Sequence, residues 1–323
     1  MTVMRWKKLG KIFDPVGAGL DRSFIGFAQA PSAVVFDDFV RIYFSTRKRS
    51  DNGKHISWIK YAEFDKSFGS ILNISQHTVI ELGERGTFDE HGIFPINIVQ
   101  YKGKMIAYTG GWSRRISVSV ETGIGIAFSE NSGKTFKKNW DGPVLSSSLR
   151  EPFLIGDPCV KLINDTFHLF YIYGTDWRIF DTVNVPERVY KIGHAVSDDG
   201  INWTKQGVQL IQDKFDYESQ AMPTVIKIGD IYHMWFCYRK SFDFRKNSRN
   251  AYKIGYAYSS DLKDWIRDDN ATGIEVSKGG WDSDMVCYPH VFNCDGKIYM
   301  LYNGNEFGKN GFGIAELVSC STM

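Results

Sequence analysis

Residues 223–238 read PTVIKIGDIYHMWFCY, and residues 254–257 read IGYA. The first stretch has a Pro and an apolar run, then a Gly-Asp turn, and then an alternating segment rich in aromatic residues. Alternation with a period of two is typical of a β-strand whose two faces differ. These residues therefore predict two antiparallel strands joined by a tight turn, with IGYA on a third strand.

The same three-part pattern returns roughly every sixty residues along the chain. The Pro with its apolar run recurs at Pro31, Pro95, Pro158, Pro223 and Pro289. The pattern x-Gly-x-Ala recurs at Ile124, Ile192, Ile254 and Phe312, and Ile59-Lys-Tyr-Ala is a degenerate first copy. Accidental similarity between the strands of a β-sandwich would not keep several signals in phase, so a repeat architecture is indicated.

Three of the x-Gly-x-Ala strands run into a polar turn that is followed by an aromatic residue. The segments are Ser129 to Phe136, Ser197-Asp-Asp-Gly-Ile-Asn-Trp203, and Ser259 to Trp265. Asp, Asn and Gly favour tight turns because they tolerate the required backbone angles or bond their own backbone. We expect the aromatic residue to begin an outer strand and to pack between repeat units.

The repeat predicts an all-β fold, a five-bladed β-propeller of four-stranded antiparallel blades. The whole chain, 1–323, forms one domain in this interpretation, with blades at roughly 22–80, 81–145, 146–212, 213–275 and 276–320. The sequence contains no long hydrophobic pattern with a period of 3.6 residues, which argues against an α/β fold. In a propeller the innermost strands line a funnel on the central axis, so we expect the functional site there.

Composition excludes several classes of function. The 39 basic and 37 acidic residues nearly balance, and no basic run could follow a phosphate backbone, so no nucleic-acid partner is expected. No secretory signal or membrane-length apolar run is visible, so we expect a cytoplasmic protein without a membrane partner. The five scattered cysteines form no C-x-x-C pair and predict reduced thiols. We expect no metal site and no cofactor.

Polar residues gather just before the repeat prolines, where each chain segment enters an innermost strand. They are Gln29, Glu90 with His91, Asp157, Glu218 with Gln220, and Asp284. Crowded carboxylates raise one another's pKa, which is costly unless a ligand or a mechanism uses them. Glycosyl transfer uses such groups as acid and base. The alternative is that they cap turns, and we favour that interpretation for Asp89, Asp216 and Asp282.

Three stretches make the chain resemble a known group of enzymes. They are Gly156-Asp157-Pro158, the turn from Ser197 to Trp203, and Trp281-Asp-Ser-Asp-Met-Val-Cys-Tyr-Pro289 with Leu301-Tyr-Asn-Gly-Asn305. The sequence resembles the five-bladed propeller glycosidases of glycoside hydrolase families 43, 32, 68 and 62, and the mannoside phosphorylases of family 130. The resemblance covers nearly the whole chain, and fold alone does not fix function.

The resemblance implies roles for individual residues. In families 32 and 43 the base or nucleophile is an Asp on blade one, and that position falls here at Gln29 or Ala30, neither of which can act as a base. Asp157 matches the Asp that orients the acid, and Glu218 is the nearest match to the general acid. Glu90 or Asp284 would then be the base or a carboxylate that holds the substrate. The missing acid on blade one argues against ordinary hydrolysis.

Family 130 implies a different arrangement, in which a single acid suffices and phosphate, held by basic residues, attacks the sugar. The basic candidates are Arg47, Arg150, Arg239, His91 and His290. Arg suits phosphate because its planar fork binds two oxygens, although Arg47 and Arg239 could equally be solvated strand ends. Trp112 and Tyr288 could stack on a sugar. Two long segments, 174–187 and 241–250, could form a rim or lid.

The sequence thus predicts a carbohydrate-active enzyme that cleaves or transfers a glycosyl unit, glycoside hydrolase-like, with Glu218 and Asp157 in the central funnel. Its partner would be an oligosaccharide or glycoside, with phosphate as a second substrate if the enzyme is a phosphorylase. A transferase in surface glycan metabolism is a further alternative. A propeller that binds carbohydrate without catalysis would also explain the missing acid.

Overall fold

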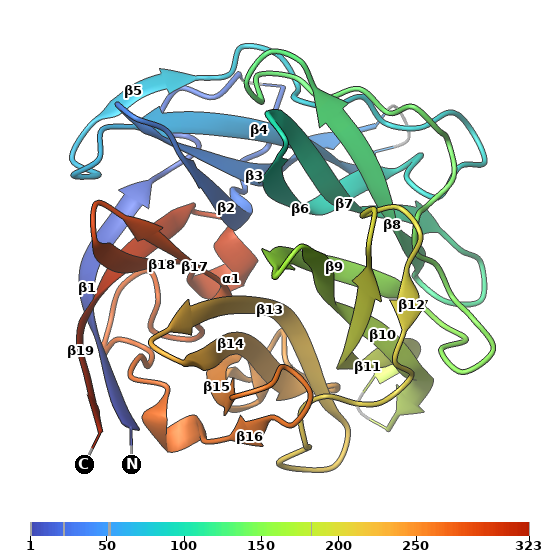
Figure 1. Ribbon diagram of the computed structural model, residues 1–323. Coiled ribbons are helices and arrows are strands. Elements are labelled where there is room, and N and C mark those ends of the chain that lie inside the picture. Colours follow the sequence, from blue (N-terminus) through green and yellow to red (C-terminus); the bar gives the residue numbers. More distant parts are fainter. Residues whose placement is uncertain (1, 22, 51–52, 182, 323) are drawn as a thin grey trace.

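A computed structural model describes residues 2–21, 23–50, 53–181 and 183–322, and of residues 2, 3, 183, 184 and 320–322 only the backbone. The described chain is almost entirely β-structure (Figure 1). Three isolated helical turns interrupt it: η1 (Ser248–Asn250), η2 (Asp269–Ala271) and α1 (Asn305–Gly308). None of the described helices is long and apolar enough to cross a lipid bilayer.

Three sheets each contain four antiparallel strands. One sheet contains β9 (Ile155–Ile163), β10 (Thr166–Phe180), β11 (Val183–Ser197) and β12 (Thr204–Lys205). The next contains β13 (Glu218–Ile228), β14 (Ile231–Lys240), β15 (Lys253–Ser259) and β16 (Ile266–Arg267). The last contains β17 (Cys287–Cys294), β18 (Lys297–Asn303), β19 (Phe312–Thr322) and the N-terminal strand β1 (Thr2–Phe13). The four-stranded antiparallel sheets expected from the sequence are therefore confirmed.

A seven-stranded sheet is formed by two antiparallel groups that meet at a single parallel pair, Ser57 and Gly92. The first group is β2 (Gln29–Val35), β3 (Val40–Arg49), β4 (His55–Phe64) and β5 (Ile71–Ile74). The second is β6 (Gly92–Tyr101), β7 (Lys104–Arg114) and β8 (Val120–Ser129). The sheets surround a centre at which β2, β6, β9, β13 and β17 lie (Figure 1), and each of these strands contacts the next, with β17 contacting β2.

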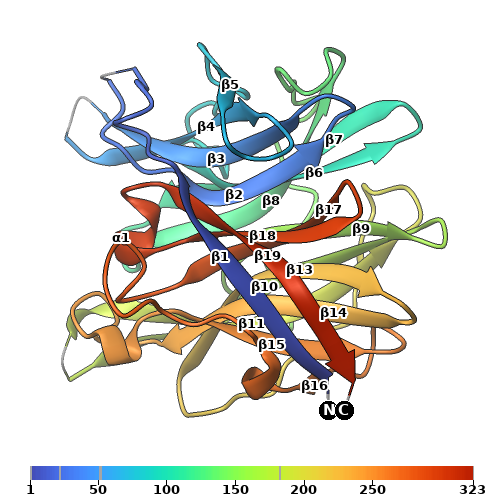
Figure 2. The same cartoon turned by 90° about the vertical axis from the view of Figure 1, so that its left-hand side faces the viewer.

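The N-terminal strand is a feature that the repeat did not mark. Strand β1 precedes the first predicted repeat unit and pairs antiparallel with β19, so the two ends of the chain lie side by side (Figure 2). Trp6 and Phe13 of β1 are buried, and Phe13 stacks on Phe312 with ring centroids 5.1 Å apart. Burial of large aromatic rings stabilises this pairing, which links the start of the chain to its last sheet.

The repeat proline of each innermost strand coincides with a β-bulge. The strand register shifts at this point in all five strands. The residues before the prolines are Ala30, Phe94, Asp157, Met222 and Tyr288. Four of them have φ between 50° and 56°, and the fifth, Phe94, precedes a cis proline. Pro cannot donate a hydrogen bond to the sheet, and a bulge turns the local side chain in a new direction.

The predicted aromatic residues after the polar turns do pack between neighbouring sheets. Trp203 stands edge-on to Tyr108 with ring centroids 5.8 Å apart, and Trp265 stands edge-on to Phe170 at 5.9 Å. The serine that begins each turn stabilises it. In one of these turns the Ser197 hydroxyl accepts a hydrogen bond from the Gly200 N–H at 2.9 Å. The Tyr108 hydroxyl donates to the Gly200 carbonyl at 2.9 Å, which joins adjacent sheets. Cys159, Cys237, Cys287 and Cys294 are buried free thiols.

Candidate active site

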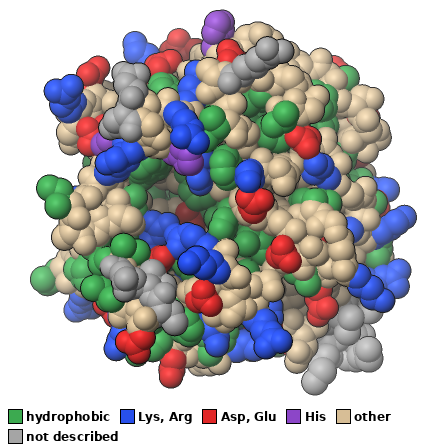
Figure 3. Space-filling model, turned by 180° about the vertical axis from the view of Figure 1, so that it is seen from behind, with side chains coloured by type: hydrophobic (Ala, Val, Ile, Leu, Met, Phe, Trp, Pro, Cys, Tyr) green, Lys and Arg blue, Asp and Glu red, His purple; other side chains and the backbone are tan. Residues whose placement is uncertain are grey.

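A cavity of about 790 Å³ opens at one end of the ring formed by the innermost strands. The face seen in Figure 3 is hollowed near its middle, and Lys and Arg side chains lie beside the hollow. The lining comes from the beginnings of innermost strands and from the ends of the strands next to them. The third strands β4, β8 and β11, the 244–252 segment and α1 also contribute to it. The predicted location of the site at the centre of the sheets thus contains a cavity large enough for several sugar rings.

The bulge residues determine which functional groups reach the cavity. Phe94, Asp157 and Tyr288 line it, whereas Ala30 and Met222 do not contribute to its lining. Of these five repeat positions, Asp157 alone carries an acid. The other lining carboxylates in the described chain, Asp284 and Glu306, are exposed to solvent, and Glu306 pairs with Lys309 at 2.6 Å. Asp157 is therefore the buried carboxylate of this cavity.

The environment of Asp157 favours its protonated form. Its side chain is buried, and one carboxylate oxygen accepts a hydrogen bond from the Met222 N–H at 3.1 Å. Burial raises the pKa of Asp157 to about 6, although the Met222 N–H and nearby Arg188 both favour the charged form. A carboxyl group with a pKa of about 6 can give up a proton and regain it near neutral pH, as a general acid must.

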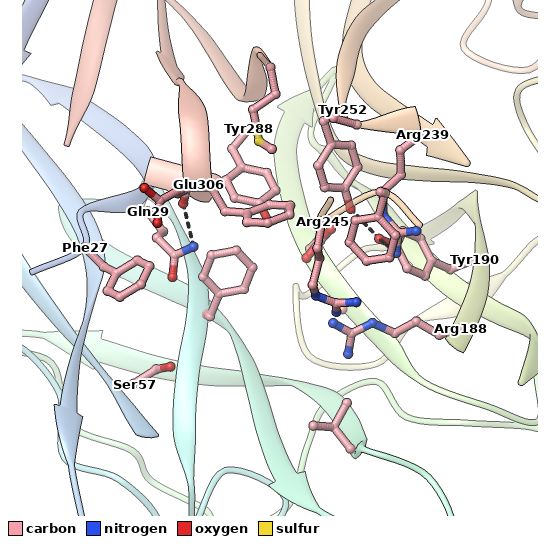
Figure 4. Close-up of a pocket in the computed structure, with 18 of the residues that line it drawn as sticks. Phe27, Gln29, Ser57, Arg188, Tyr190, Arg239, Arg245, Tyr252, Tyr288 and Glu306 are labelled. Carbon is pink, nitrogen blue, oxygen red and sulfur yellow. Dashed lines mark hydrogen bonds between the residues drawn. The ribbon is translucent and has the colours of Figure 1, made fainter. Parts of the chain in front are cut away.

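One wall of the cavity is strongly basic. Arg188 on β11 and Arg245 in the segment after β14 line it (Figure 4), and Lys246, next to Arg245, lines it too. Arg245 pairs with Glu187, which ties that segment to the β10–β11 hairpin. The Arg188 guanidinium has no hydrogen bond or ion pair with any described side chain. A wall with several cations and few anions attracts a multiply charged ligand such as phosphate.

Arg239, a predicted ligand-binding residue, supports this wall from behind. Its guanidinium donates hydrogen bonds to the Lys240 carbonyl at 2.8 Å and to the Tyr190 hydroxyl at 2.9 Å. It also lies 3.5 Å from the ring centroid of Phe244, and Tyr190 is hydrogen-bonded to Tyr252 (Figure 4). Arg239 is buried and lines the cavity, so it is not a solvated strand end. Its Nε has no partner within the described chain.

The opposite wall contains Gln29 and Arg47, both of which were predicted to contact substrate. The Arg47 Nε donates to the Gln29 side-chain oxygen at 2.9 Å, and the Gln29 amide donates to the Phe307 carbonyl at 2.6 Å. The Arg47 guanidinium lies 4.2 Å from the ring centroid of Phe27. Gln29, at the position where the resemblance implies an acid, therefore orients an arginine.

Three further predicted residues line the cavity: Asp284, Tyr288 and Trp112. Tyr288 packs against Phe94 and Tyr252, with ring centroids 5.4 and 5.6 Å away, so its ring is part of a rigid aromatic floor. The hydroxyl of Thr122, another lining residue, is buried and has no partner among the described residues. Flat rings beside unpaired polar atoms suit a sugar, which presents both apolar and hydroxyl faces.

Glu218, the predicted proton donor, does not line the cavity. It is completely buried and pairs with Arg267 at 2.7 Å. Its other contacts are the Gln220 amide at 3.0 Å and the Lys214 N–H at 2.8 Å. These partners occupy both carboxylate oxygens and hold the charge in place, so Glu218 is a structural residue between β13 and β16. The prediction placed it in the funnel because it precedes a repeat proline, but it begins the strand before the bulge.

Glu90, His91 and His290 also lie outside the cavity lining. Glu90 accepts a hydrogen bond from the Gly86 N–H at 2.9 Å, and its carboxylate lies 3.3 Å from His91. His91 stacks against Trp112 with ring centroids 6.0 Å apart, so it supports a lining residue. His290 follows Pro289 along β17, and burial lowers its pKa to about 3. The structure does not bring these three side chains to Asp157.

Sequence reasoning missed Arg188, Arg245 and Lys246. It did single out the two long segments that carry or adjoin them, 174–187 and 241–250, as a rim or lid. The first extends the β10–β11 hairpin, and the second contributes Phe244 and Arg245 to the cavity. The signal that could have found these residues was their basic character: Arg245 and Lys246 lie within the second segment, and Arg188 directly follows the first. Among the residues that the structure describes, no three His, Cys, Asp or Glu side chains are placed to hold a metal ion.

No family model matches the chain. The chain is 34% identical over 316 residues to the uncharacterized protein Rv1502 of Mycobacterium tuberculosis (strain ATCC 25618 / H37Rv), which covers 97% of this chain and 99% of the relative. A 1,2-beta-oligomannan phosphorylase of Thermoanaerobacter sp. (strain X514) is 28% identical over 141 residues, 43% of this chain and 42% of the relative.

Two solved structures share the fold over nearly the whole chain. A glycoside hydrolase superposes with a TM-score of 0.74 at 19% identity and covers 98% of this chain and 92% of its own. The beta-1,2-mannobiose phosphorylase of Listeria innocua superposes with a TM-score of 0.66 at 12% identity and covers 98% and 97%. The resemblance to propeller glycosidases and phosphorylases is thereby confirmed for the fold.

Proposed function

The chain belongs to the family of the mycobacterial protein Rv1502 and shares the fold of propeller glycosidases and phosphorylases, and from this premise we propose that it is a glycoside phosphorylase. In this reaction phosphate attacks the anomeric carbon of a glycoside and releases a sugar 1-phosphate. The observation that carries the proposal is one buried acid, Asp157, in a cavity with a basic wall. The proposal includes the arrangement of the strands as five blades around this cavity.

The number of acids separates phosphorolysis from hydrolysis. Ordinary glycoside hydrolysis uses two carboxyl groups, one to protonate the leaving oxygen and one to activate water or attack the sugar. The blade-one position offers Gln29, whose amide has no basic lone pair and is already bonded to Arg47 and Phe307. Phosphate needs no such base because it is an anionic nucleophile already. A single carboxyl group is then sufficient.

The proposed step is a single displacement. The protonated Asp157 donates its proton to the bridging oxygen as the bond from the anomeric carbon to that oxygen breaks. A phosphate oxygen forms the new bond to the anomeric carbon from the other side, which inverts its configuration. Arg188, with Arg245 and Lys246, would hold the phosphate and neutralise its charge. The Thermoanaerobacter oligomannan phosphorylase supports this choice over hydrolysis, since it matches the chain in sequence, at 28% identity over 141 residues.

The test is an assay of sugar 1-phosphate and reducing sugar from an oligosaccharide panel, with and without phosphate. We expect release only with phosphate, and we expect Asp157→Asn to reduce it by at least about a hundredfold, as the loss of a general acid does. Arg188→Gln should raise the KM for phosphate. Arg249→Gln is the matched control, because Arg249 is an exposed arginine of the same rim segment outside the cavity lining.

Each alternative has a distinct result. Phosphate-independent release that requires Asp157 would make the protein a hydrolase. A second candidate function, carbohydrate binding without catalysis, is favoured by one observation, the burial of Glu218 in an ion pair with Arg267 away from the cavity. That candidate predicts sugar binding with no product from any substrate, whether or not phosphate is present.

A further inference from the structure

Among the described residues Arg47 has no counter-ion, and it lies on the wall opposite the basic wall. It is half-buried at the end of β3, and no described carboxylate lies within the 4 Å of an ion pair. Figure 4 shows Phe27, Gln29 and Ser57 on one side of the cavity and Arg188, Arg239 and Arg245 on the other. The contacts of Arg47 with Gln29 and Phe27 place it on the first side, away from the proposed phosphate.

The neighbours of Arg47 fix its orientation and leave its fork open. Gln29 accepts from Nε at 2.9 Å, and the Phe27 ring covers the flat face at 4.2 Å. The two terminal nitrogens have no hydrogen-bond partner among the described residues. Arg47 also pairs across the sheet with Ser57, which lines the same cavity. A fixed planar fork beside a hydroxyl is complementary to the two oxygens of a carboxylate.

The surrounding charge also favours an anion. Burial lowers the pKa of Arg47, which shows that its positive charge is not fully compensated in this site. Burial lowers the pKa of the neighbouring His55 as well, and nearby arginines, Arg47 foremost, lower it further. A partly buried charge is stable when a partner neutralises it. A bound ligand can supply that partner.

We propose that Arg47 and Ser57 bind a carboxylate of the sugar, so that the substrate of this enzyme is a glycoside that contains a uronic acid. This inference rests on the proposed function for the position of the phosphate, and it specifies the sugar that accompanies it. One arginine fork matches one carboxylate, which carries a single charge. Phosphate, which carries between one and two charges at neutral pH, matches the opposite wall, where Arg188 and Lys246 lie beside the Arg245–Glu187 pair.

The test is calorimetric binding of free monosaccharides to the intact protein, with inorganic phosphate present to occupy the basic wall. Galacturonate, glucuronate and mannuronate are compared with galactose, glucose and mannose, and with the three corresponding 6-phosphates. We expect at least one uronate to bind about tenfold or more tightly than its neutral and phosphorylated counterparts, a difference of ~1.4 kcal/mol. Arg47→Gln should abolish this preference. Arg47→Lys keeps the charge without the fork and should retain only part of it.

Arg49→Gln is the matched control, since Arg49 is an exposed arginine two residues further along the same strand. Equal losses in Arg47→Gln and Arg49→Gln would overturn the proposal, because they would indicate general charge attraction. Equal binding of uronates and neutral sugars would overturn it too, and tighter binding of a 6-phosphate would assign Arg47 to a phosphate ester. If Arg47→Gln does not fold, Arg47→Lys and the ligand comparison on the unmodified protein still decide. Binding without turnover would support this site and refute only the phosphorolysis.

Discussion

Replacing Asp157 by Asn should stabilise the protein at neutral pH while it removes activity. The wild-type carboxyl group has a pKa of about 6, above its usual value of 3.8, because burial penalises its charge. Above pH 6 the folded protein therefore holds an ionised carboxylate in an unfavourable site. Asn keeps an oxygen that can accept the Met222 N–H, and it carries no charge.

The magnitude follows from the shift in pKa. A shift from 3.8 to about 6 corresponds to about 3 kcal/mol, at 1.36 kcal/mol for each pKa unit. Because the folded state binds the proton more tightly, the contribution of Asp157 to stability is fully present below pH 3.8. It declines as the pH rises to about 6 and is then lost. Asp157→Asn has no ionisable group at this position, so its free energy of unfolding does not decline for this reason as the pH rises.

The assay is urea unfolding of both proteins at several pH values from 4 to 8. The free energy of unfolding of Asp157→Asn minus that of the wild type should increase by about 3 kcal/mol over this range, mostly between pH 4 and 6. Taking the difference between two proteins cancels the titration of other groups. A difference that does not change with pH would refute the reasoning and show that Asp157 is ionised as easily in the fold as in the unfolded chain.

Three further predictions concern the frame that holds the site. Glu218→Gln should lower the free energy of unfolding by about 2–4 kcal/mol, because it leaves the partly buried Arg267 with less compensation, yet the folded fraction should stay active in the phosphorolysis assay. Gly200→Ala should cost about 2–4 kcal/mol in urea unfolding, since φ is 73° there and the new methyl group would lie 2.5 Å from the Tyr108 hydroxyl. Deleting residues 2–13 removes the strand that pairs with β19, so circular dichroism and gel filtration should show unfolded or aggregated protein. A monomeric, folded deletion variant would contradict the role given to that strand.

Much of the frame was predictable because its signals are local. The serine that begins each polar turn bonds residues only two to four positions later, as Ser197 does with Asp199 and Gly200, so the motif is visible in the sequence. Trp203 and Trp265 recur at matching places because every sheet must bury its face against the next one. Strand β1 was not predicted, because a strand that completes a distant sheet needs no repeat signal of its own.

The site was predictable where the repeat itself positions it. Asp157 and Tyr288 stand directly before a repeat proline, so the same bulge turns both towards the cavity. Glu218 stands five residues before its proline, and at that distance the sequence does not show which way a strand residue points. Arg188 gave no repeat signal either, since it belongs to the extension of one hairpin and has no counterpart in the other units.

The sequence by itself determined the all-β repeat, the antiparallel four-stranded sheets and the placement of an acid at one axial position. It could do so because period-two alternation, turn residues and prolines determine the backbone only within a few residues of where they stand. Only the tertiary structure decided which charges meet. It paired Glu218 with Arg267 on a distant strand, joined Gln29 to Arg47, and placed the charge of Arg188 close enough to Asp157 to affect its pKa. Electrostatic interactions depend on distance in space, and residues far apart in the chain become neighbours only when the sheets pack together.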